Sequence, residues 1–152
     1  IGCGERPFEA DIRLYADAYY GLDWSNSLHN MKADVIADAN RPLPIFSESV
    51  DHVVSFEVLE HLSEPDVMLT EAFRVLKPGG ELHIADWGTP DNWMMQIGSF
   101  LVQKFDGVET TADSFNGLLP DFIAQTGFVA VKETQHFNSL FGTIRLLRAG
   151  KP

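Results

Sequence analysis

A glycine-rich turn at residues 2–4 constrains this chain most strongly, because two glycines around a single residue allow a sharp bend and a close approach to a ligand. The turn is Gly2-Cys3-Gly4, with Pro7 after it and an acidic residue, Asp23, further on. A helix that follows such a turn presents unpaired N–H groups, and an acid at the end of the next strand can accept hydrogen bonds from ribose hydroxyls. The layout is typical of a nucleoside-cofactor site, although a Gly-x-Gly by itself is more often an ordinary turn.

Pro7 bears on the kind of cofactor. A dinucleotide fingerprint has a third glycine at this position, where the pyrophosphate sits on the helix N-terminus. Proline is tolerated in the first turn of a helix, but its ring fills the space that a glycine would leave open. The turn therefore disfavours NAD and suits a cofactor that has no phosphates.

Length and charge limit the classes of protein that this chain can represent. Its 152 residues are enough for one domain with a core, and 22 acidic against 11 basic residues give a formal net charge of −11. Such a charge argues against a nucleic-acid partner. The single cysteine, Cys3, excludes a disulfide framework and favours a cytoplasmic location. No apolar run reaches the ~18 residues of a membrane span.

The start of the chain is unusual for a turn of this kind. Such a turn normally follows a buried strand, but only Ile1 precedes it, and the chain does not begin with Met. We therefore expect the chain to be N-terminally incomplete, with its first strand truncated. The strand edges left open would favour pairing between copies, so a homo-oligomer is one expected state.

Strands and helices alternate along the chain. Strands are expected at 19–23, 33–39 (short and buried), 49–56 and 81–86, and helices at 7–18, 63–76 and 121–126. Ser63 is the expected cap of the second helix, and Lys77-Pro78-Gly79-Gly80 its end. This alternation predicts a doubly wound, largely parallel sheet. Residues 128–132 and 143–147 are separated by too short a connection for a helical crossover, so we expect an antiparallel pair.

Residues 87–119 differ in character from the rest, because they are rich in tryptophan, methionine and phenylalanine. We expect a helical insertion on the substrate side of the sheet, where Trp87, Trp93 and Met94 would wall an apolar acceptor pocket. Ordinary core packing is the alternative interpretation.

Five motifs follow one another at plausible spacing: Gly2-Cys3-Gly4, Gly21-Leu22-Asp23, Asp38-Ala39, the stretch 49–62, and the stretch 74–80. Together they resemble the motifs of class I S-adenosylmethionine-dependent methyltransferases, and most closely the small-molecule branch that includes the ubiquinone-biosynthesis type. The resemblance covers nearly all of the chain.

The resemblance implies a single α/β domain over residues 1–152, with a Rossmann-like, seven-stranded sheet whose last strand is antiparallel, and S-adenosyl-L-methionine as cofactor. No metal is implied. The residues that it places at the cofactor are Gly2, Cys3 and Gly4 near the methionine and ribose, Asp23 at the ribose hydroxyls, Trp24 beside the adenine, Asp38 with Ala39 at the adenine amino group, and Phe56 and Glu57 near the methionine end.

The expected function is methyl transfer to a small, apolar acceptor. Methyl transfer from a sulfonium is an in-line displacement, so positioning and exclusion of water supply much of the acceleration. His61 is the first candidate for a general base, ahead of His136 and Asp86. Glu60-His61 could equally fix the local loop. A nicotinamide or nucleotide-sugar enzyme and a non-catalytic binding module are the two competing functions.

Overall fold

The structure is a computed structural model that describes residues 1–25, 32–88, 118–138 and 143–152. Most of the expected insertion at 87–119 lies outside the described residues, as do Trp93 and Met94.

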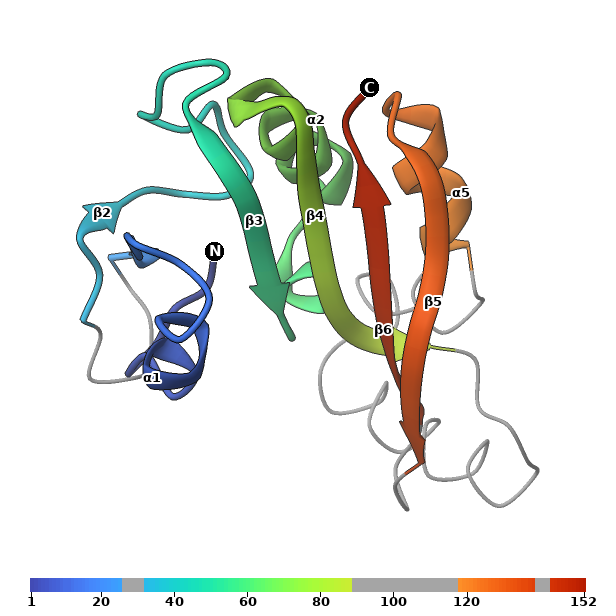
Figure 1. Cartoon of the computed structure of the whole chain (residues 1–152), viewed down its shortest axis with the longest axis horizontal. Coiled ribbons are helices and arrows are strands. Elements are labelled where there is room, and N and C mark those ends of the chain that lie inside the picture. Colours follow the sequence, from blue (N-terminus) through green and yellow to red (C-terminus); the bar gives the residue numbers. More distant parts are fainter. Residues whose placement is uncertain (26–31, 89–117, 139–142) are drawn as a thin grey trace.

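A four-stranded sheet in the order β3-β4-β6-β5 forms the larger part of the fold (Figure 1). Its strands are β3 (Val50–Phe56), β4 (Leu76–Gly88), β5 (Val129–Asn138) and β6 (Thr143–Gly150). β3 and β4 are parallel, whereas β6 is antiparallel to both β4 and β5. The antiparallel pairing expected at the end of the chain is confirmed, and both strands run longer than expected.

Two helices, α2 (Pro65–Val75) and α5 (Leu119–Gln125), pack against one face of this sheet (Figure 1). Four side chains of α2 are almost completely buried, and they recur at helical spacing: Met68, Leu69, Ala72 and Val75. They share one core cluster with Val53, Leu82 and Ile84 of the sheet and with Ile123 of α5. Each large apolar side chain buried in this way stabilises the fold by roughly 1.5–3 kcal/mol.

The ends of α2 agree with the sequence in part. The helix stops before Lys77-Pro78-Gly79-Gly80, where Gly79 takes a φ of 79° that favours glycine. The expected cap at Ser63 is wrong, because Glu64 is the N-cap residue and makes no capping hydrogen bond through its side chain. Ser63 Oγ instead donates to Asn40 Oδ1, which also accepts the Glu64 N–H.

A second, two-stranded parallel sheet consists of β1 (Leu22–Asp23) and β2 (Val35–Ile36), and a short helix, α1, covers Glu9–Ile12. Figure 1 places α1 and β2 beside β3, on the side away from β4. All three elements are shorter than expected. The expectation of a buried strand at 33–39 is wrong, because Ile36 is 60% exposed. Tyr15 lies beyond the end of α1, and its side chain is 92% exposed, so it is not part of a buried apolar face.

None of the helices in the described ranges is long and apolar enough to cross a lipid bilayer.

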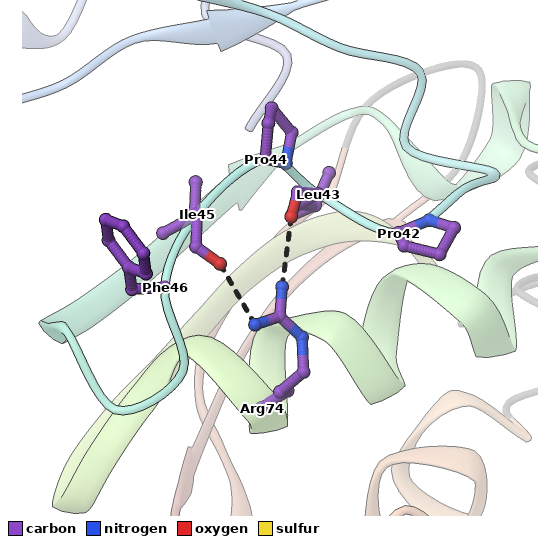
Figure 2. Close-up of a pocket in the computed structure, with 6 residues that line it drawn as sticks. All are labelled: Pro42, Leu43, Pro44, Ile45, Phe46 and Arg74. Atoms are coloured by element: carbon purple, nitrogen blue, oxygen red, sulfur yellow. Dashed lines mark hydrogen bonds between the residues drawn. The ribbon is translucent and has the colours of Figure 1, made fainter.

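A partly buried ion pair between Glu71 and Arg74 joins α2 to the loop before β3. Glu71 accepts the Leu43 N–H at 2.6 Å and pairs with Arg74 Nη2 at 2.7 Å. Arg74 in turn donates to the carbonyls of Leu43 and Ile45, at 3.0 and 2.9 Å. Leu43, Ile45 and Arg74 line an open hollow of about 400 Å³, together with Pro42, Pro44 and Phe46 (Figure 2). Because the hollow precedes the amino end of β3, it is not at the carboxyl edge where open α/β sheets bind ligands.

We expect the variant Glu71→Gln to be less stable than the wild type by about 1–3 kcal/mol at neutral pH, because Arg74 loses its charged partner. The hydrogen bond from Arg74 holds the pKa of Glu71 below its usual value. Ionised Glu71 therefore contributes fully to the free energy of unfolding above its unfolded-state pKa of about 4.3. This contribution is lost as the pH falls through the lower folded-state pKa. Urea unfolding at pH 7 and near pH 3 measures both effects.

The matched control is Glu64→Gln, which removes the same charge from an exposed side chain at the N-cap of the same helix. Equal unfolding midpoints for Glu71→Gln and Glu64→Gln at pH 7 would contradict the prediction.

Candidate functional site

The glycine turn lies between the two sheets and hydrogen-bonds both. The amino group of Ile1 donates to the Val54 carbonyl of β3 at 2.7 Å, and the Cys3 N–H donates to the Leu22 carbonyl of β1 at 3.0 Å. β1 and β3 are not hydrogen-bonded to each other. The main chain of residues 1–3 therefore sets how the β1-β2 pair sits beside the larger sheet.

Gly2 is a position where a side chain does not fit. Its φ is 67°, and a Cβ built on it would lie 2.2 Å from Cγ2 of Val58, in the loop that follows β3. Both the backbone conformation and the space thus favour glycine. The close approach brings the turn to the carboxyl end of β3, which is the edge at which ligands bind in folds of this class.

Asp23, at the end of β1, faces the glycine turn. Its Oδ2 accepts the Gly4 N–H at 2.6 Å, and its Oδ1 accepts the Trp24 N–H at 2.7 Å. Each carboxylate oxygen has two lone pairs, so both can still accept a hydrogen bond from a ligand diol. Trp24 follows directly and is exposed, which leaves its ring free to cover a flat ligand.

Asp38 follows the end of β2 by two residues, and the intervening Ala37 N–H donates to the Asp23 carbonyl at 3.0 Å. Hydrogen bonds from the main chain and the side chain of Asn40 lower the pKa of Asp38, so its carboxyl is ionised at neutral pH. Ala39 is buried beneath this loop. The two acids predicted for the cofactor thus come from adjacent strand ends.

Phe56 and Glu57 end β3 and begin the loop that follows. The Phe56 ring meets Phe8 edge to face, with the ring centroids 4.9 Å apart. Glu57 is exposed and has a φ of 52°, and its N–H donates to the Ala85 carbonyl at 2.8 Å. A positive φ in a residue other than glycine costs free energy and is common at functional sites.

The candidate bases differ in access to solvent. His61 ends a 3₁₀ helix, η1 (Leu59–His61), and its side chain is 66% exposed, with Nε2 3.9 Å from Glu60 Oε1. Asp86 is 1% exposed, and its Oδ2 accepts the Leu59 N–H at 3.1 Å. Asp86 therefore positions the helix that carries His61. Burial raises the pKa of the Cys3 thiol, which agrees with a packing role for this cysteine.

An ion pair that the sequence did not predict closes the outer side of the turn. Arg6 Nη2 lies 2.5 Å from Asp34 Oδ2, and the same oxygen accepts the Gly21 N–H at 2.8 Å. These bonds lower the pKa of Asp34. In the β1-β2 register Leu22 is level with Val35, so Gly21 is level with Asp34, and hydrophobic periodicity does not determine this register. The pocket predicted at Trp87 is not tested by the part of the chain that the structure describes. The main chain of Trp87 pairs with Ile144 in β6.

Residues 1–84 match the model of a protein family described as a methyltransferase domain. The chain belongs to this methyltransferase family. The match includes the glycine turn, both acids and the end of β3, so the site assembled above lies inside the matched region of the methyltransferase domain.

Two curated relatives and one solved structure illustrate the relationship. A Mycolicibacterium smegmatis protein named "Probable S-adenosylmethionine-dependent methyltransferase" is 37% identical over 86 residues, which are 52% of this chain and 33% of that protein. A demethylmenaquinone methyltransferase of Protochlamydia amoebophila is 37% identical over 70 residues, 46% of this chain and 28% of that protein. The chain thus spans about a third of the length of the curated relatives it matches.

The solved structure is an S-adenosylmethionine-dependent methyltransferase from Methanosarcina mazei, with a TM-score of 0.68 and 18% identity over 99% of this chain and 89% of that one. At this level of identity the likeness concerns the fold alone. The expected α/β, Rossmann-like methyltransferase fold is confirmed.

We expect Gly2→Ala to destabilise the domain, because a new Cβ meets Val58 and because a left-handed backbone costs a residue with a Cβ about 1–2 kcal/mol. Val58→Ala in the same chain removes Cγ2 of Val58, the atom that the new Cβ would meet. It should restore only the part of the lost stability that is due to this clash. Chemical unfolding of the two single variants and the double variant separates the two contributions. Independent, additive effects of the two substitutions would mean that Gly2 and Val58 are not in contact.

Proposed function

We propose that this methyltransferase domain transfers a methyl group from S-adenosyl-L-methionine to a small, apolar acceptor. The observation that carries the proposal is the Asp23 carboxylate, held 2.6 Å from the Gly4 N–H at the carboxyl edge of the sheet. This joins a glycine turn to an acid that can bind a ribose, within the region that matches the family.

Each predicted residue has a definite task in this proposal. Asp23 accepts hydrogen bonds from the ribose hydroxyls, Trp24 covers the adenine, and Asp38 with Ala39 receives the adenine amino group. Gly2, Cys3 and Gly4 let the main chain run close to the ribose and methionine. The exposed carboxylate of Glu57, next to Phe56, binds the amino group at the methionine end.

The cofactor supplies an electrophilic methyl group on a sulfonium, so the chain has to orient the acceptor and exclude water. His61 is the base that we propose for an acceptor that carries a hydroxyl, since an imidazole exchanges protons near neutral pH. Asp86 holds the Leu59 N–H and thereby the helix that presents His61. An acceptor that is already nucleophilic would not need His61.

The acceptor itself is proposed from two sources. One relative is named for methylation of demethylmenaquinone, which is a small molecule. The sequence after β4 is rich in apolar side chains, and Trp87, Trp93 and Met94 are the proposed walls of the acceptor pocket within an insertion at 87–119. A single domain, a cytoplasmic setting, the absence of a nucleic-acid partner and a homo-oligomer stay predictions from the sequence.

Titration calorimetry with S-adenosylhomocysteine and with NAD tests the class of cofactor. We expect S-adenosylhomocysteine to bind and NAD not to bind, because Pro7 replaces the glycine that a pyrophosphate needs. Binding of NAD alone would favour a nicotinamide enzyme. Binding of S-adenosylhomocysteine without methyl transfer to any of a panel of quinones, phenols and amines would favour a binding module.

We expect Asp23→Ala to weaken binding of S-adenosylhomocysteine by about 1.5–3 kcal/mol, the usual contribution of a hydrogen bond to a charged group. The control is Asp51→Ala, which removes the same charge from the amino end of β3, where Asp51 pairs with Lys77 at 2.9 Å. Unfolding curves show whether both variants are folded at the temperature of the titration. An unchanged dissociation constant for a folded Asp23→Ala protein would remove Asp23 from the site.

A further inference from the structure

The face of the sheet opposite α2 and α5 carries two histidines and a glutamate that converge. His52 is on β3, and Glu81 and His83 are on β4, where Glu81 is level with His52 in the parallel register. Between the two β4 residues, Leu82 is buried in the core, so Glu81 and His83 project to the other face. Two neighbouring strands therefore fix the three side chains in relation to one another.

Distances within this group suit a metal ion. Glu81 Oε2 lies 3.3 Å from His83 Nε2 and 4.0 Å from His52 Nδ1. All three potential ligand atoms lie within 4.8 Å of one another. Ligands on a tetrahedral zinc ion, bound at about 2.0–2.2 Å, are separated by about 3.4 Å. Small side-chain rotations would bring the three atoms to that separation.

The chemistry of the donor set also fits. Imidazole nitrogen suits zinc and the later first-row metals, whereas magnesium and calcium prefer oxygen alone. Arg148 on β6 pairs with Glu81 Oε1, which leaves Oε2 toward the imidazoles. A hydrogen bond of this kind to a ligating carboxylate is a usual feature of metal sites.

The geometry points to a surface site for one zinc-like divalent transition-metal ion, held by His52, Glu81 and His83, with water completing the coordination. An ion there would tie β3 to β4. His52 is near the amino end of β3, whereas the glycine turn contacts β3 at Val54 and the loop at Val58, so this site is separate from the proposed cofactor site. The inference does not rest on the proposed function.

Calorimetric titration of the full chain with ZnCl₂, on protein without a polyhistidine tag, tests the proposal. We expect one bound ion per chain, with no detectable binding of MgCl₂. Mutation of a residue that only hydrogen-bonds to a metal ligand typically weakens metal binding by about 10- to 100-fold. Loss of a ligand itself, in His52→Gln, His83→Gln or Glu81→Gln, should therefore weaken zinc binding by at least about tenfold.

His136→Gln is the matched control, because His136 also lies on a strand beside a glutamate, with Nδ1 2.8 Å from Glu133 Oε1. Its affinity for zinc should equal that of the wild type. Far-ultraviolet circular dichroism shows whether each variant is folded. NMR signals of the histidine rings give a readout on the intact wild type, where those of His52 and His83 should shift together on addition of zinc.

Three results would overturn the proposal. They are the absence of zinc binding at about 1 mM, an affinity that the three ligand variants leave unchanged, and ring shifts that occur at other histidines but not at His52 and His83. In each case the group would be a polar cluster in which Arg148 pairs with Glu81.

Discussion

The main chain of residues 1–4 is the connection on which the arrangement of the two sheets depends. The backbone groups of this segment, which is partly buried, find hydrogen-bond partners on both sides. Ile1 donates to β3, Cys3 donates to β1, and Gly4 donates to the Asp23 carboxylate. Because Gly2 has no side chain, this segment can also lie against Val58. Scaffold and candidate site are therefore held by the same few bonds.

Side chains of the protein bind two of the acids on this side of the domain, whereas a third can bind a ligand. Arg6 neutralises Asp34 at the outer side of the turn, and Asn40 binds Asp38. Asp23 is bound by backbone N–H groups of Gly4 and Trp24 and by no cation among the described residues. Its negative charge thus stays at the carboxyl edge of the sheet, where a ligand that donates hydrogen bonds can use it.

Elements whose side chains enter the common core were predicted close to their observed ends, whereas those at its margin were predicted too long. The strand expected at 49–56 is found at Val50–Phe56, and the helix expected at 63–76 is found at Pro65–Val75. β1, β2 and α1 follow the same kinds of pattern, but β2 and α1 contain no buried side chain, and each of the two strands pairs over only two residues. The glycine turn and the acid at the end of the next strand were expected from the sequence, but the hydrogen bond from the Gly4 N–H to Asp23 was not. The Arg6–Asp34 pair and the contact of Gly2 with Val58 depend on register and loop packing, which hydrophobic periodicity does not determine.

β3 links the two sites through different parts of the same strand. Its edge away from β4 supplies the Val54 carbonyl to the glycine turn, and its carboxyl end supplies Phe56 and the loop with Val58. The proposed metal site uses instead a side chain on the open face, at His52, and the neighbouring strand β4. A ligand changes affinity elsewhere only when it distinguishes between two states of the protein. Because a metal bridge between β3 and β4 would support a register that already exists, it would add to stability while leaving the residues proposed for the cofactor in place.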